Sequence, residues 1–134
     1  MKIYLMATLI TLTSNSSYAN EIYRHPTSGD SGTYYVLSNE KLNSSVSKVL
    51  TSRVGKNSEY TDFTEVKVNC LSNQYFELAG SSEDGLQNKP TKILTDWSKK
   101  SKWAPLVTGS SKYDLVQFIC NNKSLKLSKL QILI

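Results

Sequence analysis

The sequence predicts an α+β domain, in which an antiparallel β-sheet meander carries one C-terminal helix packed on it and one disulfide joins the two. Four runs between residues 32 and 80 are rich in β-branched and aromatic residues and closely connected, which favours strands paired in sequence order. The segment Gly109–Cys120 spaces its apolar residues three and four apart, as a helix with one buried face does. The two cysteines, Cys70 and Cys120, end the third run and this helix, so pairing them would link helix and sheet.

The first 19 residues have the three parts of a secretory signal peptide. Met1 and Lys2 give a positive start, residues 3–12 are apolar but too short to span a bilayer, and Ser17 and Ala19 are the small residues before a cleavage site. The alternative is a buried N-terminal element of an intracellular chain. Cleavage after Ala19 would leave 115 residues without a transmembrane segment, located in the periplasm, outside the cell or at its surface.

After this segment, residues 20–31 contain turn-forming residues without periodicity, which predicts a loop or flexible N-terminal arm. A single domain is then expected over residues 32–120, a length sufficient for one core. Its strands are expected at residues 32–38, 45–54, 60–70 and 74–80.

The alternation of side chains in these strands predicts which of them face the core. In the third strand, Val66 and Val68 are expected inside. In the fourth strand, Phe76 alternates with Tyr75 and Glu77.

The helix has a predicted start and an apolar face. Ser111 and Asp114 are three residues apart, which fits a capping box in which the hydroxyl accepts a first-turn N–H and the carboxylate reaches back. Residues 121–134 alternate apolar and polar side chains, so this tail is expected either to add an edge strand or to remain flexible.

The connection between the fourth strand and the helix is harder to assign. Residues 80–90 are polar and predict a long loop suited to mobility or contact. Ile93 and Trp97 fit a short helix, whereas residues 103–107, which include Pro105, fit an edge strand.

Two cysteines in an exported chain most often form a disulfide, and free thiols are the alternative. The chain contains a single histidine, so two thiols cannot complete a zinc site of the usual kinds, and we expect neither a metal nor a cofactor.

The net charge of +5 is concentrated in two lysine clusters. One cluster lies between residues 89 and 102 and the other in the tail. Outside the cytoplasm a basic patch would meet acidic glycans, anionic envelope surfaces or acidic proteins rather than nucleic acid, and the alternative is a solvated face that keeps the protein soluble. The lysines are Lys89, Lys92, Lys99, Lys100 and Lys102, followed by Lys123, Lys126 and Lys129.

Aromatic residues accompany the first cluster. Trp97 and Trp103 bracket three of its lysines, and aromatic rings interleaved with cations suit contact with a polyanion or a protein. Packing of one or both rings in the core is the alternative. The candidate binding residues are therefore Lys92, Trp97, Lys99, Lys100, Lys102 and Trp103.

The sequence does not predict catalysis. A nucleophilic hydrolase needs a base held against its nucleophile, and the one histidine, His25, lies beside Pro26 in an expected loop. Glu83 and Asp84 are adjacent rather than opposed across a cleft, as a glycosidase would require.

The order of parts resembles the surface-adhesin protein E family of Gram-negative bacteria. The similarity covers about Thr33 to Cys120 and is carried by VNC at residues 68–70, YFELAG at 75–80 and WAPLVTGSSKYDLVQFIC at 103–120. The resemblance implies an antiparallel sheet packed by a helix, a disulfide, and display at the cell surface or in the periplasm. Some members bind host proteins such as plasminogen, vitronectin or laminin.

These observations predict an exported, non-catalytic binding protein that contacts host or envelope macromolecules, and the resemblance implies an adhesin-like role. Its partner would be a protein, an acidic glycan or an envelope surface, bound through Lys92 to Trp103. The alternative is a periplasmic inhibitor or immunity protein against a cell-wall hydrolase or toxin, with Gly80 to Pro90 as the inserting loop.

Overall fold

The computed structural model describes residues 20–132, with the backbone alone for residues 122–132. The expected signal peptide, residues 1–19, lies outside the described residues, as do residues 133 and 134. The elements are β1 (Glu21–Arg24), β2 (Thr33–Lys41), β3 (Val46–Val54), the 3-10 turn η1 (Lys56–Ser58), β4 (Tyr60–Asn69), β5 (Gln74–Asp84), β6 (Thr95–Asp96), β7 (Ala104–Pro105) and α1 (Ser111–Ile132).

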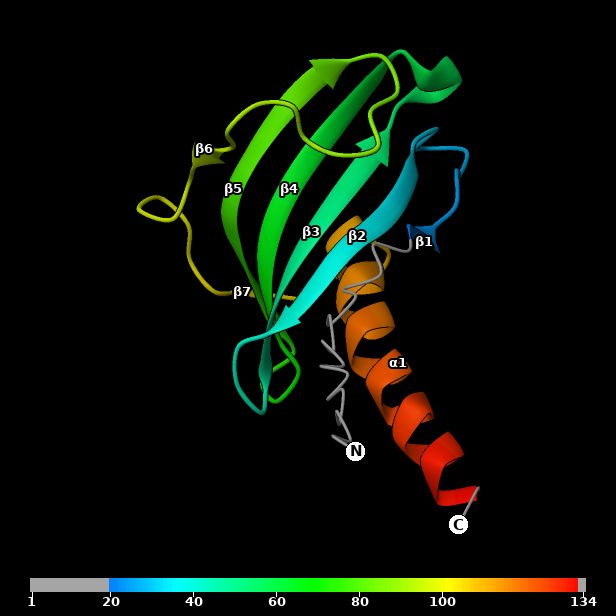
Figure 1. The fold of residues 1–134 in the computed structure, drawn as a ribbon, viewed down its shortest axis with the longest axis vertical. Coiled ribbons are helices and arrows are strands. Elements are labelled where there is room, and N and C mark those ends of the chain that lie inside the picture. Colours follow the sequence, from blue (N-terminus) through cyan, green and yellow to red (C-terminus); the bar gives the residue numbers. More distant parts are fainter. Residues whose placement is uncertain (1–19, 133–134) are drawn as a thin grey trace, which may run out of the picture.

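The strands form one antiparallel sheet in the order β1-β2-β3-β4-β5-β6, with β7 also pairing with β5 (Figure 1). Every strand from β1 to β5 lies beside its neighbour in sequence, so the predicted meander with a C-terminal helix is confirmed. β3 and β4 pair in continuous register from Val46–Asn69 to Val54–Thr61, which makes them the regular centre of the sheet.

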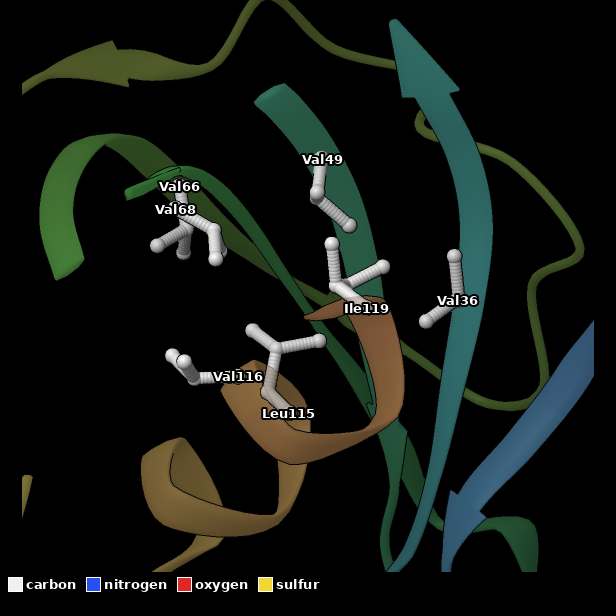
Figure 2. Packing of buried hydrophobic residues seen from close by; sticks show 7 residues of the cluster. All are labelled: Val36, Val49, Val66, Val68, Leu115, Val116 and Ile119. Carbon is white, nitrogen blue, oxygen red and sulfur yellow. The ribbon is translucent and has the colours of Figure 1, made fainter. Parts of the chain in front are cut away.

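One face of the sheet, here called the helix face, is covered by α1. Figure 2 shows Leu115, Val116 and Ile119 of the helix packed against valines of β2, β3 and β4. Val66 and Val68 are fully buried, as the alternation of residues in the third strand predicted. Burial of each such side chain contributes about 1.5–3 kcal/mol, so this contact is the main apolar core.

The opposite face, here called the outer face, has a smaller buried region under the chain that follows β5. Phe63 is 1% exposed there and Thr61 is fully buried. The Thr61 hydroxyl donates to the Gly85 carbonyl at 2.7 Å and accepts from the Gln87 N–H at 3.1 Å. These bonds fix the returning chain against the sheet.

The predicted loop over residues 80–90 is therefore wrong in its first half. Residues up to Asp84 continue β5, and Glu83 is buried, where it accepts hydrogen bonds from the hydroxyl and the N–H of Thr91. These bonds lower the pKa of Glu83 from its ordinary value. Local composition favoured a loop because four of these residues are polar, but pairing with β4 satisfies their backbone groups.

The expected loop or arm at residues 20–31 is wrong for residues 21–24, which form strand β1 against β2. The Tyr23 ring lies 5.6 Å from that of Tyr34 and 6.4 Å from that of Phe118. Arg24 donates to the Asp114 carboxylate at 3.0 Å and to the Gly109 carbonyl at 3.1 Å. Contacts with residues this distant in the chain leave no local pattern in the sequence.

The helix start differs from the predicted capping box by one residue. Ser110, rather than Ser111, accepts the Tyr113 N–H at 3.1 Å and donates to the Val107 carbonyl at 2.7 Å. Asp114 is then one position too late to reach back, and pairs with Arg24 instead. Gly109 has a φ of +87°, a conformation that glycine adopts at little cost, and this turns the chain into the helix.

At its other end α1 continues to Ile132, so the edge strand predicted as one alternative for the tail is wrong. In Figure 1 these last turns extend beyond the sheet. Among residues 20–132, none of the sheet's strand pairs includes this segment.

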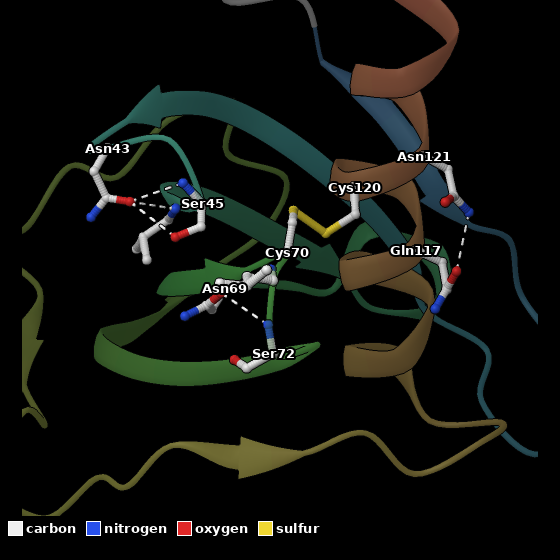
Figure 3. Close-up of a disulfide and its surroundings, with 10 residues drawn as sticks. Asn43, Ser45, Asn69, Cys70, Ser72, Gln117, Cys120 and Asn121 are labelled. Atoms are coloured by element: carbon white, nitrogen blue, oxygen red, sulfur yellow. Dashed lines mark hydrogen bonds between the residues drawn. A yellow bond between two sulfur atoms is a disulfide. The ribbon is translucent and has the colours of Figure 1, made fainter.

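The predicted disulfide is confirmed: Cys70 is joined to Cys120, with their Cα atoms 5.5 Å apart (Figure 3). Within the described residues no cysteine is free. Two turns, each closed by an asparagine side chain, lie beside the disulfide. Asn43 accepts hydrogen bonds from the N–H groups of Ser45 and Val46, and Asn69 accepts them from Leu71 and Ser72. The disulfide thus joins the helix to the end of the sheet where the β2–β3 and β4–β5 hairpins turn.

Removal of the disulfide is expected to lower the free energy of unfolding by about 4 kcal/mol, because it closes a loop with a sequence separation of 50 residues. Urea unfolding of the wild type with and without reductant measures this loss. A Cys70→Ser/Cys120→Ser variant should match the reduced protein and should not respond to reductant. An unchanged midpoint after complete reduction would contradict the prediction.

A second polar link holds the β1–β2 connection. Asp30 accepts from the Tyr34 hydroxyl at 2.6 Å, from the Arg53 guanidinium at 2.6 Å and from the Gly32 N–H at 3.1 Å. The guanidinium also donates to Tyr60, and its central carbon lies 5.6 Å from the centres of both tyrosine rings. The hydrogen bond from Tyr34, followed by that from Arg53, lowers the pKa of Asp30 from 3.8 to about 2.

Asp30→Asn is expected to lower the free energy of unfolding near pH 7 by roughly 1–2 kcal/mol, because Arg53 loses its ionised acceptor. Since folding lowers the Asp30 pKa, this contribution is complete above pH 4 and is lost as the pH falls toward 2. Urea unfolding between pH 2 and 7 should show a shallower acid-side slope in the variant. Asp84→Asn, an exposed carboxylate outside this cluster, is the matched control, and equal slopes for wild type and Asp30→Asn would contradict the assignment.

Candidate binding surface

The six predicted binding residues lie on residues 92–103, here called the edge segment, which runs along β5 at the border of the sheet (Figure 1). β6 pairs with Ala79 and Gly80, and β7, directly after the segment, pairs with Gln74 and Tyr75. The segment is thus attached to β5 near both of its ends. All six side chains are exposed: Lys92, Trp97, Lys99, Lys100, Lys102 and Trp103.

The middle of the edge segment is a hydrogen-bonded turn. The Trp97 N–H donates to the Leu78 carbonyl at 2.8 Å, and the Trp97 carbonyl accepts from Lys100 and Ser101 at 3.0 Å each. The Ser98 N–H donates to Asp96, and the hydrogen bonds from Ser98 lower the Asp96 pKa. The short helix expected around residues 93–97 is therefore wrong, whereas the edge strand expected within residues 103–107 is confirmed as β7.

A bulge in β5 determines where this turn attaches. Val66 pairs with Glu77 and Glu65 pairs with Ala79, so Leu78 is an extra residue in β5. Its carbonyl accepts the Trp97 N–H. Because a bulge shifts the alternation of side chains, Gly80 lies on the same face as Tyr75 and Glu77.

Trp97 lies on the helix face, directly over Gly80. A Cβ atom at residue 80 would lie 2.1 Å from the outer carbon of the Trp97 indole ring, closer than any real contact. The ring end therefore occupies the space that a Cβ atom at residue 80 would need, while Trp97 as a whole remains 36% exposed.

Trp103 lies on the outer face instead. Its ring centre is 5.6 Å from that of Phe76, and the Lys67 ammonium lies 4.8 Å from the Phe76 ring centre and 5.5 Å from that of Trp103. Phe76 is paired directly with Lys67 and follows Tyr75, so its side chain points away from the helix. The two tryptophans that bracket the lysines in the sequence are thus separated by the thickness of the sheet.

On the helix face the turn and β5 border an open pocket of about 340 Å³, here called the edge pocket. One wall is provided by Trp97 and Tyr75, and two cations come from Lys100 and Lys102. Glu77 also lines the pocket and forms an ion pair of 3.3 Å with Lys112 of α1. The full lining is Tyr75, Glu77, Trp97, Lys100, Ser101, Lys102 and Ala104.

The structure thus brings Trp97, Lys100 and Lys102 to one pocket and leaves Lys92, Lys99 and Trp103 outside its lining. Tyr75 and Glu77 were not among the predicted site residues. Their shared side of the fourth strand was predicted from alternation, and that signal could have identified them once Trp97 was placed on the same side.

The remaining chemistry-bearing residues do not converge. His25 is exposed in the chain after β1, and the Glu83 carboxylate already accepts hydrogen bonds from the N–H and the hydroxyl of Thr91. Within residues 20–132, no group of histidine, cysteine, aspartate or glutamate side chains is arranged to hold a metal ion. In the same range no helix combines the length and the apolar character needed to cross a membrane.

Comparison with models of protein families, with curated proteins and with solved structures finds no match to this chain.

Gly80→Ala is expected to push the Trp97 ring off β5 and to lower the free energy of unfolding by roughly 1–3 kcal/mol through overpacking. In a Trp103→Phe background, the fluorescence of the remaining tryptophan should shift to the red as the ring becomes hydrated. Gly29→Ala is the matched control, because no atom lies within 4 Å of a Cβ at that position. An unshifted spectrum in the Gly80 variant would contradict the placement of Trp97.

Proposed function

We propose that the chain is an exported, non-catalytic binding protein that contacts an acidic partner through the edge segment. The observation that carries the proposal is the exposure of four lysines and two tryptophans on a segment fixed to β5 by β6 and β7. The ion pairs among the described residues do not include any of these four lysines. Lys92 and Lys99 interact electrostatically with Glu83 and Asp96 at longer range, whereas Lys100 and Lys102 are the cations most available to an external anion.

Export is supported by two independent features. The N-terminal sequence has the pattern of a signal peptide, and the Cys70–Cys120 disulfide is stable in an oxidising compartment such as the periplasm or the cell exterior. An adhesin-like role follows from the resemblance to the surface-adhesin protein E family and remains part of the proposal.

The alternative role as an inhibitor depended on a protruding loop at Gly80 to Pro90. Residues 80–84 belong to β5, and Gly85 and Gln87 are bonded to the buried Thr61. Insertion of this region into an enzyme would require these bonds to break. The geometry therefore favours the edge segment as the contact surface.

Lys99→Glu/Lys100→Glu/Lys102→Glu is expected to weaken retention on immobilised heparin or polyglutamate by roughly tenfold or more at low salt, because three attractions become repulsions. Binding isotherms at several salt concentrations measure the effect, and the wild-type affinity should fall as salt rises.

The matched control carries the same three-charge reversal at Lys41, Lys56 and Lys89, which are exposed lysines outside the edge segment. Equal weakening in both variants would mean that only net charge matters, and equal retention of wild type and edge variant on both resins would reject the proposal.

A further inference from the structure

We infer that the edge pocket is a subsite for an acidic sugar, one carboxylate-bearing pyranose ring of a glycan. This inference rests on the proposed function and adds the chemical class of the partner. It is drawn from four properties of the pocket: its aromatic wall, its two cations, its carboxylate and its size.

The aromatic wall suits the face of a sugar ring. Trp97 approaches Gly80 of β5 and remains 36% exposed, and Tyr75 lines the same pocket with the Lys112 ammonium 5.9 Å from its ring centre. The faces of aromatic rings carry partial negative charge, and the C–H groups of a pyranose, polarised by neighbouring oxygens, are electropositive. Stacking of the two surfaces is favourable and needs no charge on the sugar.

The cations supply the preference for an acid. Lys100 and Lys102 line the pocket from the edge segment, and each ammonium group can donate up to three hydrogen bonds but accepts none. A carboxylate on the ligand would accept charge-assisted bonds from both. The Ser101 hydroxyl, which also lines the pocket, can serve as donor or acceptor.

Glu77 distinguishes a sugar from an acidic peptide. Its ionised carboxylate is only an acceptor, so it requires donors from the ligand and repels a second carboxylate. The pair with Lys112 at 3.3 Å leaves part of its acceptor capacity open, because the Glu77 side chain remains 40% exposed. Sugar hydroxyls supply the donors that aspartate and glutamate side chains lack.

The volume of the pocket matches a small group. A pocket of about 340 Å³ is at the lower end of the range of about 300–1,000 Å³ found for small-molecule sites. This volume can hold one or two sugar rings. A helix or a protein surface is too large for the pocket and would contact only the exposed lysines around it.

The test measures binding of a glucuronate-containing tetrasaccharide and of a tetraglutamate peptide by calorimetry. Trp97→Ala should weaken tetrasaccharide binding by roughly tenfold, as loss of an aromatic anchor does. Trp103→Ala is the matched control and should retain wild-type affinity, because Trp103 lies on the outer face against Phe76. Thermal unfolding of both variants verifies that each is folded.

Glu77→Gln supplies a second readout with opposite signs for the two ligands. The substitution should weaken tetrasaccharide binding several-fold, because the sugar hydroxyls lose a charged acceptor. It should strengthen binding of the peptide, because the repulsion between Glu77 and the peptide carboxylates is removed.

Three outcomes would overturn the sugar subsite: no tetrasaccharide binding by the wild type, equal losses in the two tryptophan variants, or a Glu77→Gln effect of the same sign on both ligands. Each leaves the proposed function intact if charge reversal of the edge segment still weakens retention on heparin or polyglutamate. Loss of that effect as well would reject both.

Discussion

The packing of α1 on the sheet is the contact on which the other features depend. Leu115, Val116 and Ile119 cover the valines of the central strands, and the helix is fixed at both ends of this contact. Arg24 donates to Asp114 in the first turn and to the Gly109 carbonyl just before it, while Cys120, directly after Ile119, is joined to Cys70 at the end of β4. Because Arg24 belongs to β1, the docked helix also stabilises the pairing of β1 with β2.

The same docking sets the character of the edge pocket. Lys112 in the first turn of α1 reaches Glu77 of β5, so the carboxylate in the pocket is held by the helix that covers the core. The Leu78 bulge brings Gly80 to the face of Tyr75 and Glu77 and accepts the turn that carries Trp97. The candidate site is thus built where three elements meet, although its cations come from a single short segment.

The two faces of the sheet differ in how they are covered. The helix face is closed by apolar side chains, whereas the outer face is covered near Phe63 by chain held through Thr61, Glu83 and Thr91. Polar bonds of this kind are directional and fix a position without supplying much buried area. The chain that follows β5 therefore covers the outer face of the sheet, and it is not a free loop that could insert into a partner.

The sequence by itself determined the elements whose signals are local. Alternation identified the strands around Val66 and Val68, spacing identified the helix at Gly109–Cys120, and the cysteine positions identified the disulfide. Clustering of lysines and tryptophans likewise located the edge segment. Local patterns could not reveal β1, because Tyr23 and Arg24 are ordered by partners more than 80 residues away in the helix. Only the tertiary structure decided that Trp97 and Trp103 lie on opposite faces and that Tyr75 and Glu77 complete the pocket, since one bulged residue and the approach of a ring to Gly80 set these positions.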